Sequence, residues 1–278
     1  MLYNATATID KQYEDEISEI LFTYNALSVS SEIHGQFCVI SALFDDIEKP
    51  HTFLLNNGFI TREFKDNDWK YKWLENYSGG ELTENIFIIP SDSIEKPPKD
   101  YKFIIKIDPR DAFGDGNHPT TKQCAIFLEN LLIEKNHTDS KLLDAGTGTG
   151  ILAIIASLYG IKNIDAIDIE EESINRTNIN LEFNSINSVN TLQADIGKFI
   201  VKKKYDIICA NLLTAIIIEN IDTIMSLGTP DCIYIISGIG IQWKEEIETL
   251  FSLKKLEIKE FSVLNDWCCF KLVKSDSF

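Results

Sequence analysis

The sequence predicts an α/β protein with a mostly parallel, Rossmann-like sheet, preceded by a small α+β domain. Residues 142–150 read LLDAGTGTG, an apolar strand and then a glycine at every second position, and an apolar helix-forming run begins at Ile151. A second apolar strand, residues 164–169, carries Asp168 at its end, roughly 20 residues after the glycine turn. Strand and helix patterns also alternate through residues 1–65.

The first 65 residues contain four strand patterns and two helix patterns in the order βαββαβ. Asp10 can cap the first helix, whose apolar residues recur at helical spacing up to Tyr24. The strands are expected over residues 2–9, 26–32, 36–44 and 59–64, and the second helix over residues 50–56. This order is that of a ferredoxin-like domain, which we expect over residues 1–65.

Residues 66–100 differ in composition from residues 1–65 and are expected to form an interdomain linker. Trp69 and Trp73 stand four residues apart, as they would on one face of a helix, and Lys96-Pro97-Pro98 is a stiff spacer. We expect the two tryptophans to pack on one of the domains; a stacking or substrate-binding role is the alternative.

Residues 101–278 are expected to form the second domain. A strand over residues 101–107 leads into the signature loop, residues 108–121, which carries two glycines, Phe113 and His118 and enters a helix over residues 123–132. In the simplest interpretation Thr120 or Thr121 caps that helix and His118 is satisfied locally. A loop of this composition just before the glycine turn also suggests a binding role.

Polar residues at the ends of the parallel strands predict a nucleoside site. Helix N–H groups after the glycine turn point at a ligand, and Asp144 stands just before Gly146, where it can meet the ligand's polar end. Asp168 is placed to bind a ribose hydroxyl. Asp195 and Asn211 follow the next two strands, residues 189–194 and 205–211, and we expect Asp195 to meet an adenine amino group.

The glycine spacing narrows the choice of ligand. The turn reads Gly-x-Gly-x-Gly, with Gly148 as the middle glycine, rather than the Gly-x-Gly-x-x-Gly of dinucleotide-binding proteins. No pyrophosphate-binding addition is visible in the sequence. A strand over residues 233–237, a helix over residues 243–251, and an antiparallel hairpin of strands 254–263 and 267–273 complete a seven-stranded sheet.

Composition excludes several function classes. The net charge of −17 disfavours an extended nucleic-acid surface and is compatible with a basic partner, although an acidic composition alone is also common. The six cysteines lie scattered in apolar runs and the four histidines form no cluster with them, so we expect no metal site. No stretch reaches membrane-spanning length and the first residues lack a signal pattern, which predicts a cytoplasmic protein without membrane contact.

The chain resembles the ribosomal protein L11 methyltransferase family, a family of class I S-adenosylmethionine-dependent protein-lysine methyltransferases. The resemblance covers the second domain and the linker, and the first domain matches in size and element order. The motifs that carry it are residues 112–121 (AFGDGNHPTT), 144–155, 166–169, 210–213 and 237–239, with Trp267-Cys268, and in the linker Asp68, Trp69, Trp73 and residues 88–91. The chain departs from the family where Asp115 and Asn117 replace threonines and where residues 229–232 (TPDC) replace a Pro-Gly-Gly turn.

The resemblance implies N-methylation of lysine ε-amines and of the N-terminal α-amine of ribosomal protein L11, carried to trimethylation. It implies a substrate-recognition role for the first domain. We expect the enzyme to act as a monomer. No covalent nucleophile is expected. The cofactor-binding residues, from the resemblance and from the strand-end argument together, are Thr121, Asp144, Gly146, Gly148, Asp168, Asp195 and Asn211, and the acceptor side would be formed by Phe113, His118 and Asn211.

Three alternatives remain open at this point. One is a lysine methyltransferase that acts on a different protein. Another is a binding protein that keeps the methyltransferase fold without turnover. The most remote is a dehydrogenase, which would bind NAD. His118 is the one candidate for a general base, and the proton of the acceptor amine could otherwise pass to solvent.

Overall fold

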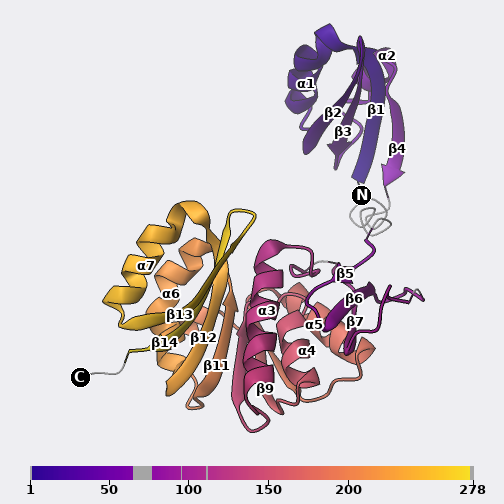
Figure 1. The fold of residues 1–278 in the computed structure, drawn as a ribbon. Helices are drawn as coiled ribbons and strands as arrows, with labels where there is room; N and C mark the ends of the chain where they lie inside the picture. The colour runs from indigo at the N-terminus through magenta and orange to yellow at the C-terminus, as the bar shows by residue number, and fades with distance from the viewer. Residues whose placement is uncertain (1, 65–76, 95, 111, 276–278) are drawn as a thin grey trace. The chain divides into compact units, whose positions relative to one another are not determined.

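The structure, a computed structural model, describes residues 2–64, 77–94, 96–110 and 112–275 (Figure 1). The chain divides into two compact units, Met1–Tyr77 and Ser78–Phe278. The predicted helical pair of Trp69 and Trp73 lies outside the described residues.

The first unit is a four-stranded antiparallel sheet with two helices. Its strands lie in the order β2-β3-β1-β4, and each neighbouring pair is antiparallel. The order along the chain is βαββαβ, so the predicted ferredoxin-like fold is confirmed. The elements are β1 (Leu2–Asp10), a 3-10 turn (Lys11–Tyr13), α1 (Glu14–Thr23), β2 (Ser28–His34), β3 (Phe37–Phe44), α2 (His51–Asn56) and β4 (Ile60–Phe64).

Alternation of side chains along the strands builds the core of this unit. In β3 the side chains of Cys38, Ile40, Ala42 and Phe44 are buried while the intervening ones are more exposed, as a strand with one covered face requires. Leu21 of α1 and Leu54 of α2 close the same core. The Asp10 carboxylate accepts a hydrogen bond from the Gln12 N–H at 3.0 Å and so caps the turn that precedes α1.

The second unit contains a seven-stranded sheet in the order β10-β9-β8-β11-β12-β14-β13. The first five of these strands are parallel, β14 runs antiparallel to β12, and β13 forms an antiparallel hairpin with β14. The predicted Rossmann-like sheet and its terminal hairpin are therefore confirmed. The strands are β8 (Lys141–Ala145), β9 (Asn163–Asp168), β10 (Val189–Gln193), β11 (Tyr205–Asn211), β12 (Gly228–Gly240), β13 (Leu256–Leu264) and β14 (Trp267–Lys274).

Helices cover both faces of this sheet (Figure 1). On one side lie α3 (Pro119–Glu134), α4 (Ile151–Leu158) and α5 (Glu171–Phe183); on the other lie α6 (Thr214–Leu227) and α7 (Lys244–Leu253). Helix α6 is absent from the elements that the sequence predicts. Its buried residues Ile217, Ile221 and Ile224 recur at helical spacing and pack on the sheet, but the run is rich in β-branched residues, which also suit a strand.

Residues 78–100 belong to the second unit, whereas we expected residues 66–100 to form a linker. β5 (Gly80–Glu81), β6 (Ile86–Pro90) and β7 (Phe103–Ile107) form a small sheet in which β6 and β7 are parallel. Ile86, Ile88 and Ile105 are fully or almost fully buried. Burial of this apolar face is what ties the segment to the second unit.

Candidate functional site

The glycine turn joins the end of β8 to the start of α4. Gly146, Gly148 and Gly150 have φ angles of 74°, 54° and 82°, a conformation that glycine adopts without strain. A Cβ atom at Gly148 would lie 2.1 Å from the carbonyl oxygen of Phe113, so the turn packs directly against the signature loop. The two glycine-bearing loops therefore form one surface at the carboxyl edge of the parallel strands, where such sheets bind ligands.

Asp144 is buried beneath this turn. Its Oδ2 accepts hydrogen bonds from the Thr147 hydroxyl at 2.7 Å and from the Ala153 N–H at 3.2 Å. Burial raises the pKa of Asp144 to about 6, against the lowering effect of these two hydrogen bonds. The carboxylate thus holds the glycine turn to the first turn of α4.

Asp168 ends β9 and faces the same turn. Its Oδ2 accepts a hydrogen bond from the Gly148 N–H at 3.0 Å, and its Oδ1 accepts one from the Glu170 N–H at 3.1 Å. Two cavities meet beside it, because Gly146, Asp168, Ile169, Leu212 and Ile216 line both of them. We call the two together the strand-end trough.

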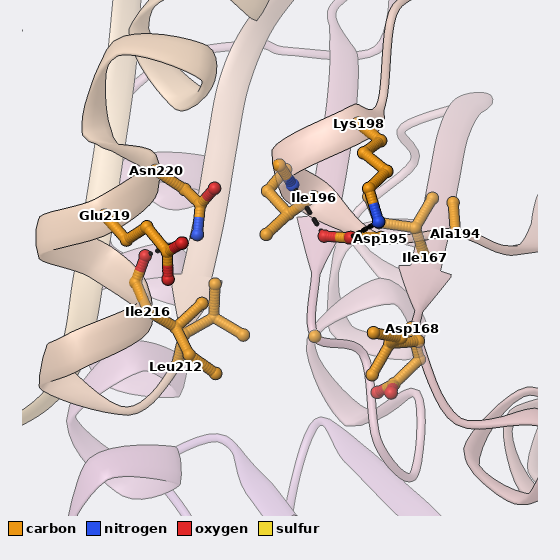
Figure 2. A pocket seen from close by; sticks show the side chains of 13 residues that line it. Ile167, Asp168, Ala194, Asp195, Ile196, Lys198, Leu212, Ile216, Glu219 and Asn220 are labelled. Atoms are coloured by element: carbon orange, nitrogen blue, oxygen red, sulfur yellow. Dashed lines mark hydrogen bonds and ion pairs between the residues drawn. The ribbon is translucent and has the colours of Figure 1, made fainter.

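The first cavity, of about 400 Å³, lies between the ends of β9 and β10 and helix α6 (Figure 2). Asp195 accepts hydrogen bonds from the Gly197 N–H at 2.9 Å and pairs with Lys198 at 3.1 Å; the Gly197 hydrogen bond, then Lys198, lowers its pKa. Glu219 and Asn220 of α6 lie across the cavity from Asp195 (Figure 2). Sequence reasoning places Asp195 here but misses Glu219 and Asn220, because it misses α6.

The second cavity, of about 480 Å³, brings together the residues predicted for the acceptor side. Phe113, His118 and Asn211 all line it, with Trp267 at the start of β14. The Phe113 and His118 ring centroids are 5.0 Å apart, and the His118 and Trp267 centroids 5.2 Å, both pairs edge to face. The sequence signals Trp267 only as part of the resemblance and assigns it no role.

His118 caps helix α3 through its Nδ1 atom. This atom accepts a hydrogen bond from the Thr120 N–H at 3.4 Å and lies 2.8 Å from the Thr120 hydroxyl. Burial lowers the pKa of His118, so the neutral ring is favoured, while Asp115 acts in the opposite direction. With Nδ1 as acceptor, we assign the proton to Nε2, and the ring then offers a donor rather than a base.

Asn211 and Thr121 retain unused polar groups. Among the described residues, no hydrogen bond is made by the Asn211 side chain, which lies at the end of β11 in the second cavity. Within the same part of the chain, the Thr121 hydroxyl is buried without a hydrogen-bond partner in the first turn of α3. Thr121 and Asp144 are not among the described residues that line the two cavities, whereas Gly146, Gly148, Asp168, Asp195 and Asn211 are.

Other kinds of site find no support in the described ranges. No group of three or more His, Cys, Asp or Glu side chains there is arranged to hold a metal ion. All six cysteines are buried and free. No helix in this part of the chain combines the length and apolar character needed to cross a bilayer.

The arrangement fits a ligand with an adenosine end and an amino-acid end. The glycine turn packs so closely on Leu212 and Phe113 that a Cβ would clash with them. Asp168 stands where the two cavities join, and Asp195 offers a carboxylate in the first cavity. This sheet order and this site define a class I S-adenosylmethionine-dependent methyltransferase, as predicted.

Comparison with known proteins places the chain within that class. The family profile described as Ribosomal protein L11 methyltransferase (PrmA) matches residues 4–275. The chain belongs to the ribosomal protein L11 methyltransferase family, which confirms the resemblance noted in its motifs.

Individual relatives agree with this assignment. A ribosomal protein L11 methyltransferase of Prochlorococcus marinus (strain AS9601) is 35% identical over 242 residues, 82% of this chain and 78% of that protein. One from Anoxybacillus flavithermus is 30% identical over 214 residues, 77% and 67% of the two chains. The crystal structure of a ribosomal protein L11 methylase from Lactobacillus delbrueckii subsp. bulgaricus has a TM-score of 0.65 at 28% identity, covering 72% of this chain and 100% of that one.

Proposed function

We propose that this protein transfers methyl groups from S-adenosylmethionine to amines of ribosomal protein L11. The observation that carries the proposal is the strand-end trough, in which a nucleoside-sized cavity of mixed polar and apolar lining and an aromatic-lined cavity share Gly146 and Asp168. Membership of the ribosomal protein L11 methyltransferase family supports the choice of substrate.

The first cavity would hold the adenosine end. Asp168 is proposed to bind the ribose hydroxyls and Asp195 the adenine amino group, with Ile169 and Ile216 against the base. Asn220 of α6 adds an amide that lines the same cavity. These roles suit an uncharged base better than a phosphate. Among the described residues that line the cavity, Asp168, Asp195 and Glu219 carry carboxylates and only Lys198 carries an amine.

The junction and the second cavity would hold the amino-acid end and the acceptor. On the cofactor side we propose Gly146, Gly148, Asn211 and the first turn of α3, which carries Thr121. Asp144 would act through the glycine turn that it holds. Phe113 and His118 would line the acceptor side, with Asn211 between the two.

Methyl transfer requires little from the protein beyond alignment of the acceptor amine with the methyl donor. When bound, S-adenosylmethionine supplies a methyl group on a positively charged sulfur, an excellent leaving group. The chain must exclude water and present the amine lone pair in line with the carbon–sulfur bond. Exclusion of water also lowers the pKa of a lysine ammonium, normally about 10.4, so that the neutral amine becomes available.

The acceptor amine must lose a proton in each round. His118 is a poor acceptor for it because Nδ1 is engaged at the helix cap, so we propose that water takes the proton. Repeated transfer, as far as trimethylation of lysine ε-amines and of the N-terminal α-amine, would require the amine to rotate within the second cavity.

The ferredoxin-like unit would bind the substrate protein. A net charge of −17 supports a basic partner and weighs against an extended nucleic-acid surface. We propose that the enzyme acts as a monomer in the cytoplasm, where ribosomal proteins are made.

A transfer assay tests this function. Purified ribosomal protein L11 and a second basic ribosomal protein are mixed in equal amounts with the enzyme and methyl-labelled S-adenosylmethionine. Label confined to L11 supports the proposal. Label on the second protein alone would indicate a different substrate, and absence of label with cofactor binding intact by calorimetry would indicate a binding protein.

A further inference from the structure

Three aromatic rings from separate parts of the chain form one side of the second cavity. Phe113 comes from the signature loop, His118 from the cap of α3 and Trp267 from the start of β14. We call these three residues the aromatic wall. The interplanar angles of 67° and 65° are those of edge-to-face pairs, in which the positive edge of one ring meets the negative face of the next.

Trp267 is held in place by its hairpin. Asn265 and Asp266 both have positive φ, 47° and 64°, as the two central residues of a tight type I′ turn between β13 and β14 do. The Ile241 N–H donates to the Asp266 carbonyl oxygen at 2.8 Å, which ties this turn to the end of β12. The backbone at Trp267 is therefore fixed from two sides.

A buried glutamine links the same hairpin to helix α3. Gln123 is only 3% exposed; its Nε2 donates to the Trp267 carbonyl oxygen at 3.1 Å, and its Oε1 accepts from the Ser262 hydroxyl at 2.6 Å. Since α3 begins at the residue after His118, Gln123 fixes the hairpin relative to the His118 ring. We therefore assign to the buried amide of Gln123 the role of positioning the aromatic wall.

The charge around the cavity favours a cation. Its lining contains the carboxylates of Asp168 and Glu170, and no lysine or arginine of the described residues is among it. The negative face of an indole attracts ammonium and methylammonium groups, most strongly when water is excluded. The combination of rings and carboxylates therefore favours the amine in its protonated form, before the proton passes to water.

We infer that Trp267 is a specificity-determining residue on the acceptor side, where its indole holds the cationic amine of the substrate and the still cationic, partly methylated amine between rounds. The inference rests on the proposed amine-methylating function and adds Trp267 to the acceptor-side residues. Gln123 is the positioning residue that keeps the indole in the wall.

The first test does not depend on the protein substrate. The chain has four tryptophans, so a sample labelled with ¹⁵N-tryptophan gives few indole signals, and the Trp267→Phe spectrum assigns the one of interest. With S-adenosylhomocysteine bound, tetramethylammonium chloride is added. The Trp267 signal should shift, and the signal of Trp243, which is partly exposed but outside the cavity lining, should not. Sodium chloride and neutral tert-butanol serve as controls.

The second test uses the protein substrate. Trp267→Leu should lower kcat/KM for ribosomal protein L11 by roughly 5- to 30-fold and shift the products toward fewer methyl groups, with S-adenosylmethionine affinity unchanged within about twofold. Trp267→Phe should recover most of the activity, and Trp243→Leu should behave as wild type.

The outcomes separate this inference from the proposed function. An unshifted Trp267 signal, equal effects of Trp267→Leu and Trp243→Leu, or a parallel loss of cofactor affinity would each overturn the role of Trp267. If the wild-type enzyme leaves L11 unmodified but the Trp267 signal shifts, the proposed substrate fails while the cation-binding wall stands.

Discussion

The carboxylate of Asp168 accepts a hydrogen bond from the backbone N–H of Gly148 at a distance of 3.0 Å. This bond joins the end of β9 to the glycine turn after β8, so the residue proposed to bind ribose also shapes the turn proposed to hold the amino-acid end. The two halves of the site are therefore coupled through one side chain.

Replacement of Asp168 by alanine should abolish most cofactor binding. A hydrogen bond to a charged group contributes about 1.5–3 kcal/mol, and loss of two such bonds to ribose predicts an affinity at least about 100-fold lower. Calorimetric titration with S-adenosylmethionine measures this. Asp231→Ala, which removes an exposed carboxylate at β12, is the control. An unchanged affinity in Asp168→Ala would remove the ribose assignment.

The two glycines of the turn should differ in their tolerance of alanine. A Cβ at Gly148 would meet the Phe113 carbonyl oxygen at 2.1 Å, whereas one at Gly146 would meet the end of the Leu212 side chain at 2.3 Å. Because a side chain moves more easily than backbone, Gly148→Ala should lower the free energy of unfolding by about 1–3 kcal/mol more than Gly146→Ala does. Chemical denaturation of both variants measures the difference.

A third variant isolates the cost of the backbone conformation. Gly160 also has positive φ, 98°, but its nearest added contact, the Thr138 methyl, lies at 3.3 Å. Gly160→Ala should therefore lower the free energy of unfolding by about 1–3 kcal/mol through backbone strain, with little contribution from displaced neighbouring atoms. Equal losses at Gly146 and Gly148 would contradict the close packing of the turn on the signature loop.

The stability of the ligand-free enzyme should depend on pH through the titration of Asp144. Its pKa is raised to about 6 by burial, above the unfolded value of about 3.9. The folded state therefore binds a proton more tightly than the unfolded state, and the contribution of Asp144 to stability falls as pH rises from about 4 to about 6, then levels off. Two pKa units correspond to at most about 3 kcal/mol.

Asp144→Asn removes this titration while it keeps an oxygen that can accept from Thr147 and Ala153. The variant should be more stable than wild type at pH 8, and the difference should shrink toward pH 5. Urea denaturation at both pH values measures it. A stability difference that does not change with pH would show that Asp144 has an ordinary pKa in the folded protein.

The pH dependence of catalysis should not report His118. His118→Asn keeps a side-chain oxygen that can cap α3 but removes the ring from the aromatic wall. The rate should fall, yet the pH profile of kcat/KM should keep the wild-type shape, because water and not His118 takes the proton from the acceptor amine. An acidic limb that is present in wild type and lost in the variant would identify His118 as a general base.

Much of the fold was predictable because local patterns and global structure agree. The unit from Leu142 to Asp168 combines apolar strands, a glycine turn and a helix start, and few other structures satisfy all three. Helix α6 was missed because its isoleucines suit a strand as well as a helix. The association of β6 with β7 could not be predicted from either segment alone, because pairing between strands depends on both partners.

The candidate site was predictable where a residue ends a strand and not where it faces the site from elsewhere. Asp168, Asp195 and Asn211 follow strands whose carboxyl ends meet at one edge, and the structure places all three in the trough. Trp267 and Asn220 reach it from β14 and α6, so only the three-dimensional arrangement shows that they belong to it. Burial of Asp144 beneath the turn likewise depends on how α4 packs.

The most direct test of the account is the intact mass of ribosomal protein L11 after incubation with this enzyme and S-adenosylmethionine, followed by fragmentation to locate the change. The account predicts mass gains in steps of one CH₂ unit, located on lysine side chains or on the N-terminal amine, and no gain with Asp168→Ala. An unchanged mass of L11, with S-adenosylmethionine bound normally by the wild-type enzyme, would contradict it.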